Sequence, residues 1–166
     1  MVGRTKPIHG GTARWHRGKA LRFAAFILLV PAAGLLIGAL NIPGAWYAGL
    51  NKPSFNPPDW VFAPVWTVLF LLIGFAGFRT FERKAQGAAA TLWSLQMALN
   101  FAWSPVFFSL HRIDLALAVI LPMLAAIIAF VWCQWREDLT ASLCFVPYAA
   151  WVGFAAALNT AIFLLN

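Results

Sequence analysis

Five apolar runs, each long enough to cross a lipid bilayer, limit what this chain can fold into. They cover approximately residues 20–40, 57–78, 88–108, 113–135 and 140–165. A helix of about 20 residues, with a rise of about 1.5 Å each, matches a hydrocarbon core of about 30 Å. Only 10% of the residues are charged, against about 25% in a soluble domain. The sequence therefore predicts an all-α membrane protein, a bundle of five transmembrane helices formed by residues 20–166.

The distribution of basic residues predicts the orientation of this bundle. Residues 1–19 contain no acid and five of the twelve Lys and Arg, and we interpret them as a mobile basic tail attracted to anionic lipid headgroups. Ten Lys and Arg fall on the side of the tail, and only Lys52 and Arg112 fall on the other. The positive-inside rule then places the N-terminus in the cytoplasm and residues 46–60 outside. Orientation explains the net charge of +7, so no nucleic-acid partner is expected.

The connection between the first two runs, residues 46–60, is long, aromatic and rich in proline. Each proline fixes its own φ and pushes the preceding residue towards extended geometry, so this loop should have a defined position. We expect residues 46–53 to cover the bundle as a lid. Asn56 is expected to cap a helix that begins at Pro57. Lys52, the only charge in the lid, is expected to point to water rather than to a ligand.

The apolar runs lack the groups that several membrane functions require. No Asp, Glu, Lys or Arg lies near the middle of a run, where a proton-coupled transporter or an ion pump normally has an ionisable group. The three histidines lie in the tail or in a loop, so paired haem-ligating histidines are missing. No Ser/His pair or Cys/His cluster lies within the runs, and the sequence predicts neither a hydrolase nor a metal site.

The interior of the runs contains uncharged amide and aromatic side chains instead. Gln96 and Asn100 are four residues apart and so share a helix face. A single amide of this kind more often joins two helices, by a hydrogen bond worth about 0.6 kcal/mol, than it forms part of a ligand site. Together with aromatic side chains on facing helices, the amides favour a cavity for a large planar apolar ligand. The interior set is Trp66, Trp93, Gln96, Asn100, Trp103, Tyr148, Trp151 and Asn159.

Gly34 and Gly38, in the first run, form a pair of small residues that allows another helix to approach closely. That helix belongs either to the same bundle or to a second copy of the chain. The sequence does not decide between these alternatives.

Four sequence blocks in a fixed order carry a resemblance to a known family. They are WYAGLNKPSFNPP at 46–58, VFAPVWTVLF at 61–70, QMALNFAWSPVFF at 96–108 and VPYAAWVGFAAALN at 146–159. The chain resembles the TspO/MBR family, the tryptophan-rich sensory proteins related to the mitochondrial translocator protein, or peripheral benzodiazepine receptor. The resemblance extends over about residues 20–166.

This resemblance implies a five-helix bundle, commonly a homodimer, that binds porphyrins such as protoporphyrin IX and benzodiazepine-type ligands. It also implies that the first loop closes the pocket, and that porphyrin is a ligand, with no cofactor required. Mammalian members carry a cholesterol motif, Leu/Val–x–Tyr–x–Lys/Arg, at the end of the fifth helix. Here no Lys or Arg follows Tyr148, so specific cholesterol binding is not expected. The expected ligand-binding residues are Tyr47, Pro53, Trp66, Phe70, Gln96, Asn100, Trp103, Phe107, Tyr148 and Trp151.

Three functions remain open from the sequence. The first is a sensor or regulator of tetrapyrrole metabolism. The second, implied by bacterial members that degrade porphyrin in light, is an enzyme in which Trp66 and Trp151 are the candidate catalytic residues. The third is a passive transporter of porphyrin or of a small apolar ligand. Because the sequence contains no evident general base, metal site or nucleophile, we rank the enzyme below the sensor.

Overall fold

A computed structural model describes residues 11–166, with side chains from residue 17 onward. This part of the chain is helical and contains no strand, which confirms the prediction of an all-α protein. The helices are α1 (Gly11–Leu40), α2 (Ala45–Ala48), the 3₁₀ helix η1 (Asp59–Val61), α3 (Phe62–Arg83), α4 (Ala88–Ser104), the π-helix η2 (Pro105–Ser109), α5 (Ile113–Gln134) and α6 (Leu139–Leu165).

Four segments of the described chain are long and apolar enough to cross a membrane. They are Arg17–Leu40, Asp59–Arg83, Ile113–Gln134 and Leu139–Leu165. The remaining predicted span, 88–108, is divided between α4, with 17 residues, and η2, with 5. Pro105 has no backbone N–H, so it cannot donate the hydrogen bond of a regular α-helix. The N–H of Leu110 donates to the carbonyl of Pro105, five residues earlier, at 2.9 Å, which is the π-helical pattern.

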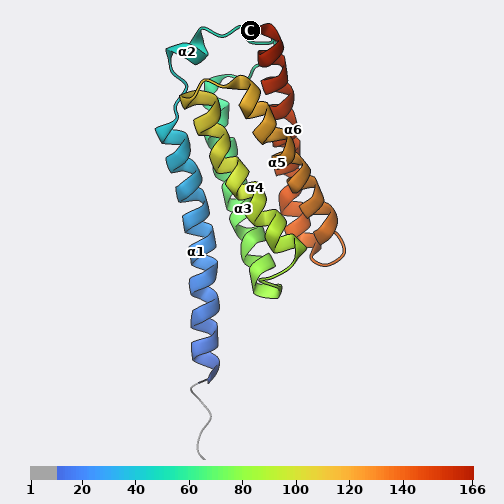
Figure 1. The fold of residues 1–166 in the computed structure, drawn as a ribbon. Helices are drawn as coiled ribbons and strands as arrows, with labels where there is room; N and C mark the ends of the chain where they lie inside the picture. Colours follow the sequence, from blue (N-terminus) through green and yellow to red (C-terminus); the bar gives the residue numbers. More distant parts are fainter. Residues whose placement is uncertain (1–10) are drawn as a thin grey trace, which may run out of the picture.

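The five long helices run alongside one another, and α2 lies across one end of the bundle (Figure 1). We call this the lid end; it comprises residues 41–61, residues 105–112 and the C-terminus. The opposite end, with the connections 84–87 and 135–138, is called the basic end. Between the two ends, Ile73, Phe130, Phe145 and Val152 are fully buried.

Two glycines allow helices to approach closely in this core. A Cβ atom on Gly74 would lie 2.6 Å from the carbonyl oxygen of Phe26, so α1 and α3 touch through their backbones there. A Cβ atom on Gly77 would lie 2.6 Å from the indole of Trp93. That indole donates to the carbonyl of Ile73 at 3.0 Å. Trp93, predicted to be an interior residue, therefore joins α3 to α4.

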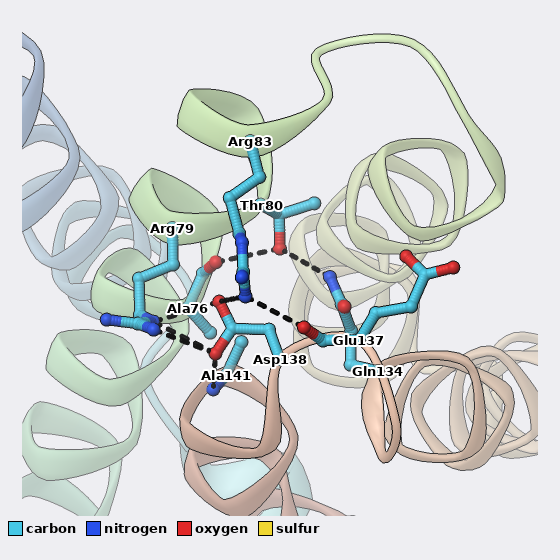
Figure 2. A network of polar contacts seen from close by, with 8 residues as sticks. All are labelled: Ala76, Arg79, Thr80, Arg83, Gln134, Glu137, Asp138 and Ala141. Carbon is cyan, nitrogen blue, oxygen red and sulfur yellow. Dashed lines mark hydrogen bonds and ion pairs between the residues drawn. The ribbon is translucent and has the colours of Figure 1, made fainter.

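Ion pairs join the end of α3 to the connection before α6 at the basic end, as Figure 2 shows. The guanidinium of Arg79 donates to the carboxylate of Asp138 through Nη2 at 2.9 Å and through Nε at 3.0 and 3.1 Å. Arg83 lies 3.0 Å from the same carboxylate and also donates to the carbonyl of Glu137. Asp138 caps α6 by accepting from the N–H of Ala141 at 3.2 Å. Although burial raises the pKa of Asp138, the hydrogen bonds from Arg79, Ala141 and Arg83 outweigh it and hold that pKa below its usual range.

Two helix boundaries differ from their predicted positions. Helix α1 begins at Gly11, so residues 11–19 continue the helix instead of forming a mobile tail; the first ten residues lie outside the described part. Helix α3 begins at Phe62, after η1, so the prediction that it starts at Pro57 was wrong. Pro57 precedes another proline, which disfavours helical geometry, and Pro58 is extended, with φ −60° and ψ 145°.

Candidate functional site

A cavity of about 520 Å³ lies at the lid end, enclosed mainly by α1, α3, α4 and α6. Its volume is within the range of about 300–1,000 Å³ that ligand pockets occupy. Aromatic side chains form a large part of its wall, and Asp59 is the only one of its described lining residues with a charge at neutral pH. The aromatic lining residues are Tyr47, Phe62, Trp66, Phe70, Phe101, Trp103, Phe107, Phe108 and Trp151.

Two stacked pairs of rings provide flat surfaces in this wall. Trp66 stacks on Phe70 in α3, with ring centroids 5.2 Å apart. Trp103 stacks on Phe107 across the junction of α4 and η2, with centroids 5.1 Å apart. Each pair has a spacing of four residues, which places both rings on one face of a helix. The lining therefore suits a flat, apolar ligand.

A chain of buried hydrogen bonds fixes the position of Asn100, a polar residue of the lining. The amide of Asn100 donates to the hydroxyl of Tyr148 at 2.9 Å. Tyr148 donates in turn to the Oε1 atom of Gln96 at 2.9 Å. The Gln96 amide donates to the carbonyl of Trp93 at 2.8 Å. Because Tyr148 and Gln96 are fully buried, they orient Asn100 from behind the cavity wall.

A second polar contact fixes the indole of Trp103. Its N–H donates to the Oδ1 atom of Asn159 at 3.2 Å, and the Asn159 amide donates to the carbonyl of Ile113 at 3.3 Å. Asn159 lines the cavity and joins α6 to α4 and to the start of α5. The sequence placed it in the interior set, but it was not among the expected ligand-binding residues.

Contacts within the loop hold Tyr47, the residue of the lid that lines the cavity. The hydroxyl of Tyr47, a buried residue, donates to the Oδ1 atom of Asn56 at 3.2 Å. Asn56 therefore holds the lid and does not cap α3, so that expectation was wrong. Lys52 lies over the ring of Tyr47, 4.5 Å from its centroid, and donates to the carbonyl of Ala48 instead of pointing to water. Burial raises the pKa of Tyr47, and the charge of Asp59 adds to this shift.

The lid is also attached to the bundle on two sides. The backbone N–H of Asn51 donates to the side chain of Asn166, and the Asn166 amide donates back to the Asn51 carbonyl, both at 3.0 Å. Trp46 stacks on His111, with centroids 4.3 Å apart. The lid thus contacts α6 at its C-terminus and the connection that follows η2.

Comparison with known proteins identifies the family of this chain. The TspO/MBR family matches residues 26–165. The chain belongs to the TspO/MBR family. It is 38% identical to the tryptophan-rich sensory protein of Cereibacter sphaeroides, over 87% of this chain and 92% of that protein. It is 39% identical to the tryptophan-rich protein TspO of Archaeoglobus fulgidus, over 88% of this chain and 97% of that one. It is 33% identical to the human translocator protein, over 83% and 86% of the two chains.

Most of the residues expected to bind ligand in this TspO/MBR protein lie in the cavity wall. Pro53, Gln96 and Tyr148 do not. The carbonyl of Pro53 accepts from the N–H of Asn56 within the lid, at 3.0 Å. A role in ligand binding stays a prediction for every member of the set. The members that line the cavity are Tyr47, Trp66, Phe70, Asn100, Trp103, Phe107 and Trp151.

Helix α1 forms part of the cavity wall, which the sequence did not predict. Gly34 and Gly38 both line the cavity. A Cβ atom on Gly34 would overlap the ring of Phe70, whereas one on Gly38 would have no neighbour within 4 Å. Gly34 therefore packs within the same chain, against α3. A homodimer stays a prediction.

Trp151 separates the cavity from a second hollow on the outer surface of the bundle. This apolar groove, of about 620 Å³, runs between α3 and α6 and is lined by Val68, Leu72, Pro147 and Ala150, among others. Trp151 is the lining residue that the groove and the cavity share. Trp151 therefore contacts both hollows.

Proposed function

We propose that this TspO/MBR protein binds a porphyrin, or a similar planar apolar ligand, in the cavity beneath the lid, and acts as a sensor or regulator of tetrapyrrole metabolism. The observation that carries the proposal is the pair of stacked aromatic surfaces, Trp66–Phe70 and Trp103–Phe107, in one cavity with the oriented amide of Asn100. Aromatic walls stack on a macrocycle, and a few fixed polar groups orient it.

The names of the relatives agree with this proposal. One relative is a "tryptophan-rich sensory protein" and another a "translocator protein". These names describe those proteins, and the cavity supplies the physical reason for extending a ligand-binding role to this chain. Bound ligand and closed lid would stabilise one another, because the lid is part of the wall through Tyr47.

The proposal includes five membrane spans, with α4 and η2 together forming the third. Helix α4 runs alongside α3 and α5 (Figure 1), and η2 follows it directly in the chain. The positive-inside count then puts the N-terminus in the cytoplasm and the lid outside. Membrane lipid is the surrounding partner, and a homodimer is the expected assembly.

A titration of the purified protein with protoporphyrin IX in detergent, in the dark, tests ligand binding. Saturable quenching of tryptophan fluorescence is expected, since the lining contains Trp66, Trp103 and Trp151. Asn100→Ala should weaken binding about three- to tenfold, because it removes a polar contact worth about 0.5–1.5 kcal/mol. Linear, non-saturable quenching by the wild type would contradict the proposal.

Light-dependent degradation of porphyrin is the second candidate function, and it is favoured by the indole side chains in the cavity wall. Three indoles, of Trp66, Trp103 and Trp151, line the same cavity, where a light-absorbing macrocycle with molecular oxygen as oxidant would face them. The same titration under light should then show loss of porphyrin absorbance. A Trp66→Phe/Trp151→Phe variant that consumes porphyrin as fast as the wild type would exclude the role of these two indoles. Porphyrin flux into proteoliposomes in the dark would favour a passive transporter instead.

A further inference from the structure

Lys52 is the charged residue of the lid, and the proposed function gives it no role. Its side chain is half-buried, and its ammonium group lies over the ring of Tyr47, 4.5 Å from the ring centroid. Tyr47 in turn lines the cavity. A cation within about 6 Å of an aromatic centroid is attracted to the face of the ring. This contact therefore holds a positive charge against a residue of the cavity wall.

The ammonium group of Lys52 keeps donors for an incoming anion. In the described part of the chain it donates to neutral acceptors, the backbone carbonyls of Ala48 at 3.3 Å and Leu50 at 3.5 Å. Both bonds are longer than the usual N–H···O distance of about 2.9–3.0 Å. No ion pair among the described residues includes Lys52. Because an ammonium group binds a carboxylate more strongly than a neutral carbonyl, a carboxylate at the lid would displace one of these bonds.

The interior of the cavity has no favourable position for a carboxylate. Its described lining residues include no Lys, Arg or His. The amides of Asn100 and Asn159 already donate to Tyr148 and Ile113. Moving a carboxylate from water into such a site is costly unless a positive charge or several hydrogen bonds compensate. The acidic edge of a planar ligand should therefore stay at the lid end, where Lys52 lies.

We propose that Lys52 recognises a carboxylate on the edge of the bound ligand, and that it makes the cavity selective for planar ligands with an acidic edge over neutral ligands of the same ring. This inference rests on the proposed function, since it assumes that a planar ligand occupies the cavity. Protoporphyrin IX belongs to this class, because it carries two propionates on one edge of its ring. The ring would pack against the aromatic wall, and the acidic edge would attach the ligand to the lid.

Asp59 limits the strength of this recognition. It lies in η1, is exposed to water and lines the cavity. Its charge acts on Tyr47, whose pKa it helps to raise, so both charges of the loop lie near the same residue of the wall. A ligand carboxylate at Lys52 is therefore partly opposed by Asp59. In such solvent-accessible surroundings, one ammonium group is expected to change the affinity for an acidic ligand by about three- to tenfold.

Two porphyrins of the same ring test this selectivity. The diacid protoporphyrin IX and its uncharged dimethyl ester are titrated in the dark, in the same detergent, into the full-length wild type, Lys52→Met, Lys52→Arg and the control Lys84→Met. Methionine keeps an unbranched stem over Tyr47 and removes the charge, whereas arginine keeps the charge. Lys84 is exposed in the connection 84–87 at the basic end, so the control removes one positive charge far from the lid (Figure 1).

Lys52→Met is expected to bind the diacid about three- to tenfold more weakly than the wild type, with the ester affinity unchanged within about twofold. The unchanged ester affinity also shows that the variant is folded. Lys52→Arg should keep the preference for the diacid, and Lys84→Met should match the wild type for both ligands. The loss should shrink in about 0.5 M salt, because screening weakens a charge effect and leaves a packing effect unaltered.

Three results would overturn the inference and leave the proposed function intact. In the first, Lys52→Met weakens both porphyrins equally or weakens neither. In the second, Lys52→Arg loses the preference as Lys52→Met does. In the third, Lys84→Met weakens the diacid as much as Lys52→Met, which would assign the effect to net charge. Absence of saturable binding of both porphyrins to the wild type would overturn the proposed function, and this inference with it.

Discussion

The two ends of the bundle are held together by different chemistry. At the basic end, Asp138 is buried and receives two guanidinium groups, so charge joins α3 to the start of α6. At the lid end, amides, hydroxyls and aromatic rings make the contacts, as between Tyr47 and Asn56 or Asn51 and Asn166. The ion pair of Arg112 with Asp114 at that end is exposed.

This difference separates a fixed end from an end that can open. Hydrogen bonds to charged groups contribute about 1.5–3 kcal/mol each, and neutral ones about 0.5–1.5 kcal/mol. The lid is attached by a few neutral bonds, so opening it costs much less than separating α3 from α6 at the other end. The cavity lies at the end with the weaker attachments, which is where the proposed ligand would enter if the lid opens.

The largest effect is expected from Asp138→Asn. The amide still caps α6, so the change removes the charge and keeps the acceptor for the Ala141 N–H. Losing one partner of a fully buried pair costs about 3–5 kcal/mol. The Arg79 and Arg83 side chains are 34% and 57% exposed, and solvent screens their charges. The free energy of unfolding is therefore expected to fall by about 2–3 kcal/mol. Thermal unfolding in detergent measures it, and Asp114→Asn, which breaks an exposed pair, should change the midpoint little.

The same variant should alter the response to acid. The pKa of Asp138 is lowered in the folded protein, so its ion pairs stabilise the fold fully above the ordinary carboxyl pKa of about 3.9. That stabilisation is lost as the pH falls through the lower, folded-state pKa. The stability difference between wild type and Asp138→Asn should therefore be constant near neutral pH and shrink in strong acid. A difference that grows with acidification would contradict this account.

An intermediate effect is expected from Gly34→Ala, compared with Gly38→Ala. The new Cβ at residue 34 would overlap the ring of Phe70 and push it from its stack with Trp66. Overpacking of this kind costs about 1–3 kcal/mol, and the displaced ring should also weaken porphyrin binding. At residue 38 nothing lies within 4 Å, so alanine there should be neutral or slightly stabilising. Equal effects at both glycines would show that α1 does not form this wall.

The sequence predicted the parts of the structure that depend on local spacing. Trp66 and Phe70, or Gln96 and Asn100, are four residues apart, and this spacing alone places each pair on one helix face. The apolar runs in the same way predicted the long helices. The start of α3 was missed because the preference of proline for the first helical turn was weighed above the constraint that Pro58 imposes on Pro57.

The parts that the sequence did not predict depend on contacts between distant residues. Asn51 and Asn166 are separated by 115 positions, and no local pattern joins them. Arg79 and Asp138 are separated by 59 positions, and no local pattern indicated that the structure brings them together. The residues of α1 that line the cavity are small or aliphatic, so nothing in their chemistry indicated a ligand. Nothing in the sequence marked Asp59 as a residue of the cavity, although it lies in the lining.

A smaller effect on stability, with a clear effect on the cavity, is expected from Tyr148→Phe. Removing the hydroxyl leaves Gln96 without its donor and frees the amide of Asn100. The expected loss of stability is about 1–2 kcal/mol, with porphyrin affinity reduced several-fold because Asn100 is no longer oriented. Ser142→Ala is the matched control, since it removes another buried hydroxyl of α6, bonded to the carbonyl of Val131 at 2.8 Å. It should lower stability and leave the affinity unchanged.

The smallest effect is expected from Asn166→Ala, which detaches the lid from α6. The change removes both hydrogen bonds with the backbone of Asn51. Because these bonds are exposed and local, they should contribute about 1 kcal/mol to lid closure and almost nothing to global unfolding. Porphyrin should then dissociate about fivefold faster, as measured by stopped-flow transfer to an acceptor, with an unchanged unfolding midpoint. Thr160→Ala, whose hydroxyl bonds only to the carbonyl of Ala156 in its own helix, should dissociate like the wild type. If porphyrin dissociated from Asn166→Ala at the wild-type rate, the lid would not limit release of the ligand. The two ends of the bundle would then differ only in their contribution to stability.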